Sequence, residues 1–338
     1  MDWFERLTGF RETDYDDTRR KLKVEDGQLQ SLVNGKSYAT GTLELVSLQA
    51  LRERVISAGA LTGQLKVSVV TGDVRAMHQL PENSSGLFQV ASQFNLLEMT
   101  SNHVAPEHGV TRYAGDHTQG PACALAAGAA TIYRNYFAPV GDAIGQTRDR
   151  QLDGLADLGL ALSAALGLPV DALWSMENGY AMCSRSGLDA ISAHLESLSQ
   201  EARDALSGRL RIGVHSDVEV TDAPGPNRPL VSQAFCSALP LAYVRSVPTR
   251  HWQSFAILIL QATYEATLWA AVLNSQRGAS SLVLLTQVDG GAFGNHDDWI
   301  HAAIQQALHK VAGFDLEVKL VSYGTPSPAL LEMARDFG

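Results

Sequence analysis

The chain has 338 residues, of which 45% are hydrophobic and 18% are charged, so it can form a sizeable core, and this composition argues against long disorder. Its formal net charge of −10 argues against a broad nucleic-acid-binding surface and a polybasic membrane patch, and we expect neither nucleic acid nor a membrane as a partner. The three cysteines are widely spaced and form no C-x-x-C pair, which argues against a zinc module or a disulfide framework and favours a reducing, cytoplasmic location.

The N-terminal segment differs in composition from the rest of the chain. Charged residues are dense in its first half, and the pairs Asp26-Gly27 and Asn34-Gly35 then stand eight residues apart between short β-prone runs. Both pairs are typical of type I′ turns, in which the two central residues need positive φ. We therefore predict a small β-meander and then a helix over Leu45–Ala58, and we assign residues 1–63 to an extension packed on a core of residues 64–338.

From about residue 64, apolar runs alternate with helical patterns. The expected strands are Leu65–Val70, Leu87–Phe94, Tyr180–Cys183, Leu210–Val214, Leu230–Phe235, Ser281–Thr286 and Leu316–Val321. The expected helices are Gly120–Tyr136, Gln151–Leu166, Gly187–Leu206, Trp252–Leu273 and Asp298–Ala312. Several strands are continuous apolar runs, which is typical of strands covered on both faces, so the pattern predicts a mixed, mostly parallel α/β sheet between helix layers. The stretch 211–240 lacks a helical pattern and indicates a hairpin within that sheet.

The most apolar long stretch is Phe255–Asn274. It contains Gln261, Thr263, Glu265 and Thr267, whose polar groups are costly at the centre of a bilayer. We therefore predict a buried core helix here.

The most informative motif is the glycine-rich turn Gly290-Gly291-Ala292-Phe293-Gly294. A predicted strand enters this turn and a predicted helix leaves it, with Asn295 between them. Glycines allow a ligand close to the backbone, and successive N–H groups in such a turn can bind a diphosphate. The spacing matches neither the P-loop nor the dinucleotide-binding fingerprint. The alternative is a tight turn with a core phenylalanine.

Polar residues follow two other predicted strands. The turn Gly72-Asp73-Val74 offers a carboxylate that can accept from an exocyclic amine such as that of adenine, or can cap a helix. Asn95 stands near the end of the next strand, where its amide can bond a ribose hydroxyl or satisfy local backbone. Ligands of open α/β sheets bind beyond the carboxyl ends of the strands, so we expect these side chains in one crevice.

Two further segments carry groups of ionisable residues. The loop 106–121 contains Glu107 and Asp116 and leads into a helix of small residues, which Asp116 or Thr118 can cap. The run 215–219 alternates His215, Asp217 and Glu219, which places them on one face of a strand. That face is either a metal or acid–base cluster or the solvated side of an edge strand.

Taken in order, these motifs resemble the macrodomain superfamily of ADP-ribose binders and hydrolases. Gly72-Asp73-Val74 resembles the adenine-contacting turn of the family, and Asn95 resembles its strand-end asparagine near the distal ribose. The helix from Gly120 takes the position of the helix that follows the family's first glycine-rich loop. The turn at 290–294 resembles the Gly-Ala-Phe-Gly diphosphate loop of poly(ADP-ribose) glycohydrolases.

The resemblance covers residues 64–323 and implies a macrodomain-like three-layer α/β/α sandwich. It also implies kinship with bacterial effector hydrolases that remove ADP-ribose from ubiquitin. The Gly-Gly-Gly and Gln-Glu-Glu stretches of the glycohydrolases are absent from the loop 106–121. The catalytic candidates therefore rest on position and chemistry: Asp116 first, then Glu107, with Asp217 or Glu219 from the facing strand.

The implied function is hydrolysis of the C1″ ribosyl bond of an ADP-ribosylated protein, with ubiquitin as one candidate carrier. Carboxylates would supply acid–base catalysis, without a metal or other cofactor. The residues expected to contact ADP-ribose are Asp73, Val74, Asn95, Thr118, Gln119, Gly120, Gly290, Gly291, Ala292, Phe293, Gly294 and Asn295. Two alternatives stay open: a reader that binds ADP-ribose without cleaving it, and a metal-dependent nucleotide hydrolase that uses the strand 215–219.

Overall fold

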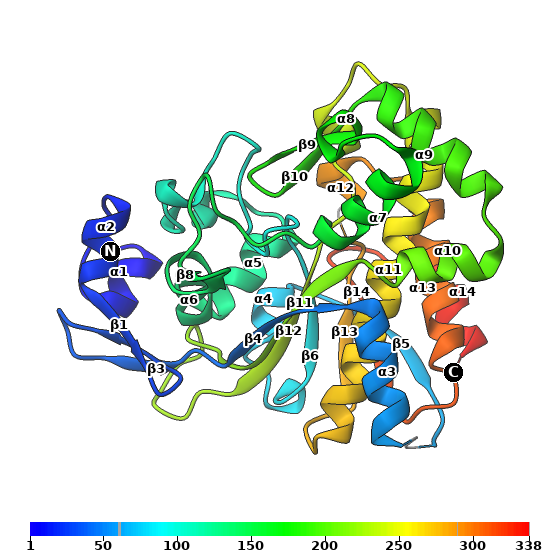
Figure 1. Cartoon of the computed structure of the whole chain (residues 1–338). Coiled ribbons are helices and arrows are strands. Elements are labelled where there is room, and N and C mark those ends of the chain that lie inside the picture. The colour runs from blue at the N-terminus through cyan, green and yellow to red at the C-terminus, as the bar shows by residue number, and fades with distance from the viewer. Residues whose placement is uncertain (60–61, 289, 338) are drawn as a thin grey trace.

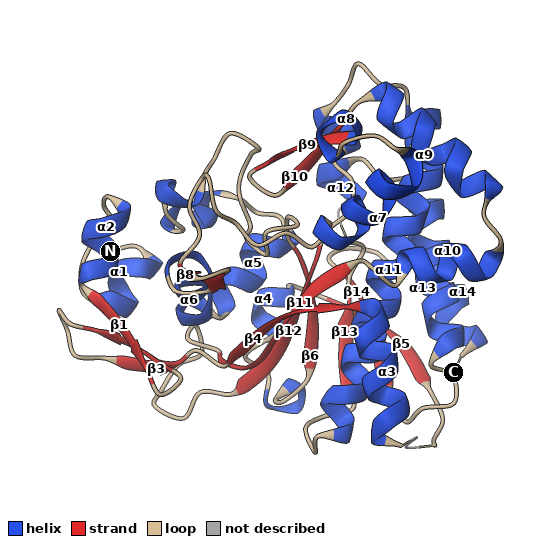
Figure 2. Cartoon of the chain, viewed as in Figure 1, coloured by secondary structure: helices blue, strands red, loops and turns tan. Residues whose placement is uncertain are grey.

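The computed structural model describes residues 1–59, 62–288 and 290–337. A seven-stranded sheet lies between two layers of helices (Figures 1 and 2). Its strands, in spatial order, are β4 (Thr42–Ser47), β11 (Arg211–Glu219), β12 (Leu230–Cys236), β6 (Leu87–Ala91), β13 (Leu282–Leu285), β14 (Glu317–Ser322) and β5 (Lys66–Thr71). Strands β12, β6, β13, β14 and β5 are parallel, whereas β4 and β11 are antiparallel to their neighbours. The mixed, mostly parallel sheet and the β11–β12 hairpin are therefore confirmed.

Helices cover both faces of the sheet. One layer contains α3 (Leu48–Ala58), α9 (Arg185–Ser197), α11 (Thr249–Gln276) and α13 (Asp297–Lys310), and the other contains α4 (Val74–Met77), α5 (Gln119–Ala126) and α6 (Gly128–Tyr136). The other helices are α1 (Trp3–Thr8), α2 (Tyr15–Arg20), α7 (Ala156–Leu166), α8 (Val170–Leu173), α10 (Gln200–Ser207), α12 (Gly290–Phe293) and α14 (Pro328–Asp336). Short 3-10 helices span Pro81–Asn83 (η1), Pro106–His108 (η2), Thr111–Gly115 (η3) and Leu241–Tyr243 (η4).

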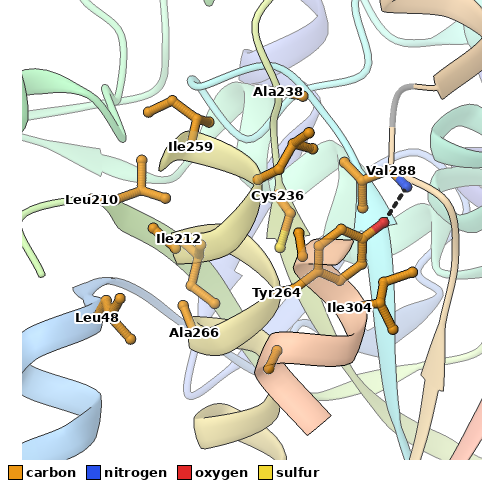
Figure 3. Packing of buried hydrophobic residues seen from close by; sticks show 14 of the residues in the cluster. Leu48, Leu210, Ile212, Cys236, Ala238, Ile259, Tyr264, Ala266, Val288 and Ile304 are labelled. Atoms are coloured by element: carbon orange, nitrogen blue, oxygen red, sulfur yellow. Dashed lines mark hydrogen bonds between the residues drawn. The ribbon is translucent and has the colours of Figure 1, made fainter. Parts of the chain in front are cut away.

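Helix α11 occupies the centre of the larger core. It packs against α3, α9 and α13, and its side chains Ile259, Tyr264 and Ala266 point among residues from the sheet and those helices (Figure 3). By length and composition α11 could cross a membrane, but most of its side chains are buried inside the protein. The expectation of a buried core helix is confirmed.

The N-terminal segment forms the predicted meander, with strands β1 (Leu22–Glu25), β2 (Gln28–Ser31) and β3 (Ser37–Ala39). Asp26 and Gly27 have φ of 49° and 71°, as a type I′ turn requires. The second turn differs from the prediction: the connection between β2 and β3 is longer, and of Asn34 and Gly35 the glycine alone takes positive φ. Strand β4 belongs to the central sheet, so the sheet begins within the segment that the sequence assigned to an extension.

Two expected helices are each divided. The helix predicted over Gly120–Tyr136 is broken at Ala127 (φ −113°, ψ 58°), where the N–H of Gly128 donates to the hydroxyl of Thr221. A Cβ on Gly128 would lie 2.8 Å from Trp3, so helix α1 approaches the break closely. The helix predicted over Gly187–Leu206 is α9 and α10, and Ser199 caps the second. Both breaks depend on side-chain hydrogen bonds that helical periodicity does not reveal.

The expected strand Tyr180–Cys183 lies outside the central sheet. It forms strand β10, which pairs with β9 (Trp174–Glu177) in a two-stranded hairpin. Asn178 and Gly179 supply the turn, with φ of 47° and 84°, and this Asn-Gly signal was overlooked in the sequence. A second small hairpin pairs β7 (Pro139–Val140) with β8 (Ala143–Ile144).

His78 is a buried histidine between helix α4 and the sheet. Its Nδ1 donates to the carbonyl of Val74 at 2.7 Å, its Nε2 accepts from Gln233 at 3.1 Å, and its ring stacks on Phe88. Burial lowers the pKa of His78 from 6.5 to about 4. Between these two values the unfolded chain binds a proton that the folded chain does not, so stability is present above pH 6.5 and falls towards pH 4.

Replacing His78 with phenylalanine removes this pH dependence. From the shift, the wild-type chain should lose about 2–3 kcal/mol between pH 7 and pH 4.5 at this residue alone. Urea unfolding at the two pH values measures the loss in each chain. The variant is expected to be less stable at pH 7 but to lose less on acidification. An equal loss of unfolding free energy in the wild-type and His78→Phe chains would contradict the assignment of this pH dependence to His78.

Candidate active site

Two hollows lie end to end beyond the carboxyl ends of the parallel strands. The first, about 250 Å³, includes Asp73, Val74 and Tyr323 in its lining. The second, about 270 Å³, includes Glu98, Asp116 and residues 291–293. Thr118, Gln119 and Gln287 line both hollows, so the two form one groove. The groove thus runs from the turn after β5 to the glycine-rich turn after β13.

The groove opens where strands β6 and β13 part. They pair at Leu87 and Phe88, and beyond that point the side chain of Gln119 takes the place of a neighbouring strand. Its Oε1 accepts from the N–H of Ala91 at 2.7 Å, and its Nε2 donates to the carbonyl of Gln89 at 2.8 Å. Gln119 therefore satisfies the exposed end of β6 and at the same time forms part of the groove wall.

Asp73 lies at one end of the groove and also caps helix α4. Its Oδ1 accepts from the N–H of Arg75 at 2.8 Å. Both interpretations of Asp73 are therefore compatible, because one carboxylate can cap a helix and still line a hollow. Tyr323, whose ring is 86% exposed, lines the same end and was not singled out from the sequence. The available signal was an aromatic residue directly after the last predicted strand.

The glycine-rich turn forms the short helix α12 and lines the other end of the groove. Phe293 is buried and packs against Tyr180 and Tyr243 at 5.3 and 5.7 Å between ring centroids. The chain entering the turn is fixed by Tyr264 of α11, whose hydroxyl donates to the carbonyl of Thr286 and accepts from the N–H of Val288, both at 2.8 Å (Figure 3). The core helix thereby sets the position of the turn.

Two glycines of the groove differ in whether the packing of the protein requires them. A Cβ on Gly120 would lie 2.0 Å from the carbonyl oxygen of Ala91, so helix α5 can begin against β6 only with glycine there. A Cβ on Gly291 would meet nothing within 4 Å, although Gly291 lines the groove. The packing of the protein therefore explains Gly120, whereas at Gly291 glycine leaves open space on the groove side.

Two carboxylates face the second hollow. Asp116, the first candidate from the sequence, is partly buried, and its Oδ1 accepts from the N–H and the hydroxyl of Thr118 at 2.9 and 2.7 Å. Glu98 was not among the predicted site residues; it is 1% exposed and accepts from Nη2 of Arg134 at 2.9 and 3.3 Å. Burial raises the pKa of Glu98 to about 7, against the lowering effect of Arg134. The sequence signal was a glutamate just past the strand end.

Four predicted site residues other than Asp217 do not line the groove, and one of them is Gly294, which has φ 78°. Both carboxylate oxygens of Glu107 accept from the N–H of Arg148, at 2.8 and 2.9 Å. The side chain of Asn95 is buried, where it donates to Gln151 and accepts from the N–H of Leu97. Its amide serves the local backbone and a neighbouring side chain, so its predicted contact with a ribose is not supported. Asn295 is likewise buried and donates to the carbonyl of Leu239.

Asp217 is the other catalytic candidate that lies elsewhere. A bulge in β11 lies between His215 and Val218, and Asp217 there has φ 58°. The bulge breaks the alternation on which the prediction depended. His215 is buried, Asp217 pairs with Arg277 at 2.7 Å, and Glu219 pairs with Arg228 at 3.0 Å. Within residues 1–59, 62–288 and 290–337, no three metal-binding side chains converge. The cluster on which the metal-site alternative depended is therefore not formed by these residues.

The loop that carries Asp116 is anchored from the N-terminal segment. The Oε1 of Glu12 accepts from the N–H of Val110 and the hydroxyl of Tyr136 at 2.9 and 2.8 Å, and its Oε2 accepts from the N–H of Thr111 at 2.7 Å. One carboxylate therefore satisfies two N–H groups at the start of η3 and the hydroxyl of Tyr136 at the end of helix α6. The extension thus fixes a segment that leads directly to the groove.

Comparison with known proteins gave matches among solved structures. No family model and no curated protein matches the chain. The chain is similar to poly(ADP-ribose) glycohydrolase from Deinococcus radiodurans in complex with ADP-ribose, at 12% identity and a TM-score of 0.47, over 87% of this chain and 93% of that one. It is also similar to the Thermomonospora curvata enzyme, at 13% identity and a TM-score of 0.45, over 94% of both chains.

Replacing Glu12 with alanine should loosen the loop before Asp116. Because the change leaves buried donors without an acceptor, we expect a loss of about 2–3 kcal/mol of stability. Urea unfolding measures the loss, and faster hydrogen exchange at the amides of Val110 and Thr111 locates it. Glu25→Ala is the matched control, since that side chain is 64% exposed. Unchanged exchange at both amides would contradict the anchoring role of Glu12.

Proposed function

We propose that this chain hydrolyses the bond between C1″ of ADP-ribose and a side chain of a carrier protein. The observation that supports the proposal most directly is the groove formed by the two adjoining hollows. At one end it presents Asp73, which suits a purine amine, and at the other it presents the glycine-rich turn and two carboxylates. Ligand pockets usually measure about 300–1,000 Å³, and the two joined hollows together fall within that range.

The remote half of the substrate would be held without a cationic site. The amides of the turn at 290–294 would bind the diphosphate, and open space at Gly291 would allow its close approach. Asp73 would accept from the adenine amine, and the exposed ring of Tyr323 offers a stacking surface beside it. Binding energy from this half would position C1″ against the carboxylates, which raises the rate of the chemical step.

The two carboxylates have different surroundings, which suits different roles. Cleavage at C1″ passes through a transition state that resembles an oxocarbenium ion. We assign the leaving-group proton to Glu98, whose raised pKa keeps part of the population protonated near neutral pH. Asp116 would stabilise the positive charge and accept a proton from the attacking water, whose oxygen forms the new bond to C1″. The proton removed from water restores Glu98, so no proton is gained or lost in a cycle.

We propose further that the reaction needs no metal. The carboxylates of the second hollow accept hydrogen bonds from Arg134 and Thr118, so donors on the protein itself stabilise their negative charge in place of a cation. Treatment with EDTA should leave the rate unchanged, and a chelator-sensitive rate would overturn this part of the proposal.

Release of ADP-ribose tests the function directly. The chain is incubated with proteins that carry ADP-ribose on arginine, acidic or serine side chains, ADP-ribosylated ubiquitin among them. Free ADP-ribose is measured by chromatography, and calorimetry measures its binding. Release from at least one substrate supports the proposal. Binding of ADP-ribose without release from any substrate would identify a reader instead.

Replacing Glu98 with glutamine should separate catalysis from binding. Glutamine keeps the shape but cannot donate the proton, so we expect kcat to fall by about 10²–10⁴ while the Kd for ADP-ribose changes little. In the wild-type chain kcat should decline as pH rises through about 7, because Glu98 then loses its proton. Glu107→Gln, which alters a carboxylate outside the groove, is the control. A Glu98→Gln chain with wild-type kcat would refute the assigned role.

Replacing Gly291 with alanine tests the diphosphate site. The added Cβ meets no protein atom, and alanine is about 1 kcal/mol more favourable than glycine in a helix, so stability should stay the same or rise. The Kd for ADP-ribose should increase tenfold or more, because the methyl group occupies space needed by the ligand. Gly313→Ala is the matched control, since it too has nothing within 4 Å and lines neither hollow. Equal Kd values for ADP-ribose in the wild-type, Gly291→Ala and Gly313→Ala chains would show that the diphosphate does not bind at this turn.

A further inference from the structure

A third hollow, of about 300 Å³, lies beside the second hollow of the groove. Its lining residues are Asn102, His103, Arg148, Met176, Glu177 and Asn178. We propose that this carrier hollow binds the polypeptide from which ADP-ribose is released, and that Arg148 selects an acidic side chain near the modified residue. The inference rests on the proposed function, which places the scissile bond in the adjoining part of the groove.

The same two segments line the groove and the carrier hollow. Thr100 and Tyr180 line the groove, whereas Asn102 and Asn178, two residues away on each segment, line the carrier hollow. The segments are bonded to each other on both sides. The hydroxyl of Tyr180 donates to the carbonyl of Met99 at 2.7 Å, and Nδ2 of Asn178 donates to the carbonyl of Asn102 at 2.7 Å. The hairpin β9–β10 (Figure 1) and the loop after β6 therefore form one wall between the two spaces.

A chain of amide hydrogen bonds fixes the floor of the carrier hollow. Nδ2 of Asn102 donates to Glu177 at 2.6 Å, and Nε2 of Gln151 donates to Oδ1 of Asn178 at 3.1 Å. Oε1 of Gln151 in turn accepts from Asn95 at 2.8 Å. The fully buried Asn95 is thus committed to the support of this hollow. A polar surface held in this way is already ordered before a partner binds, which lowers the entropic cost of binding.

Charge indicates the chemistry of the occupant. The backbone N–H of Arg148 is bound by Glu107, which fixes the loop, while its guanidinium forms no ion pair with any residue in the described ranges. Glu177, the acidic residue of the hollow, keeps its negative charge but is held on Nδ2 of Asn102 at 2.6 Å rather than on the guanidinium of Arg148. An exposed, unpaired guanidinium matches a carboxylate, which it can bind through two parallel hydrogen bonds. In a chain with net charge −10, such a cation beside the groove favours an acidic side chain at this one place.

Three substrates separate the carrier hollow from the groove. The first is a peptide with one ADP-ribosylated residue flanked by glutamate, the second is the same peptide with lysine in the flanks, and the third is a small aryl ADP-ribosyl conjugate without a peptide. Wild-type chain, Arg148→Glu and Arg148→Gln are compared by kcat/KM. Arg209→Glu, an exposed arginine in the turn before β11, is the matched control.

We expect the wild-type chain to prefer the glutamate-flanked peptide at least fivefold, and Arg148→Glu to reverse this preference. Arg148→Gln should abolish the preference, and the small conjugate should be cleaved equally by all four chains. Loss of activity on all substrates in the Arg148 variants would indicate a structural role and overturn the inference, as would an unchanged preference. Poly(ADP-ribose) is assayed in addition, and an Arg148 effect confined to it would identify the polymer as occupant and also overturn the inference. If the wild-type chain cleaves none of the substrates, the proposed function fails and this inference fails with it.

Discussion

The candidate active site depends on the buried guanidinium of Arg134. Its Nε donates to the carbonyl of Leu96 at 3.0 Å, its Nη2 donates to Glu98, and its Cζ lies 3.8 Å from the ring centroid of Phe235. One side chain of helix α6 therefore fixes the segment that follows β6, on the floor of the groove. Removal of one partner from a buried ion pair leaves the other charge uncompensated and costs about 3–5 kcal/mol. Arg134 consequently determines both the position of the groove floor and the protonation of Glu98.

The overall architecture could be predicted because it depends on patterns that are local in the chain. Continuous apolar runs indicated the parallel strands, and a stretch without helical periodicity indicated the hairpin of β11 and β12. The errors arise where tertiary contacts override the local pattern. Ala127 breaks a helix because Thr221, distant in the sequence, binds the next N–H. Asp217 leaves its expected face because a single inserted residue reverses the alternation in a strand.

The site was predicted in part for the same reason. Asp73 and the glycine-rich turn follow strands directly, so their approach to one crevice follows from the parallel topology, whereas Asp116 reaches it from the loop before helix α5. Asn95 also follows a strand, but its side chain turns away from the groove to Gln151, and no spacing rule distinguishes the two directions. Glu98 was overlooked because its importance depends on burial beside Arg134, which lies 36 residues further along the chain. Glycines present the same difficulty, since the sequence does not separate a glycine required by packing, such as Gly120, from one that leaves open space, such as Gly291.

The pKa of Glu98 results from two opposing effects, of which burial is the larger. Burial raises the pKa of its carboxyl, and the charge and hydrogen bonds of Arg134 lower it. Together they bring its pKa to about 7, which is the value at which a group can both give and take a proton under physiological conditions. Of the two carboxylates that the sequence singled out in the loop 106–121, Asp116 lines the groove, whereas Glu107 binds the N–H of Arg148. The second carboxylate comes from the loop after β6, where Arg134 of helix α6 binds it.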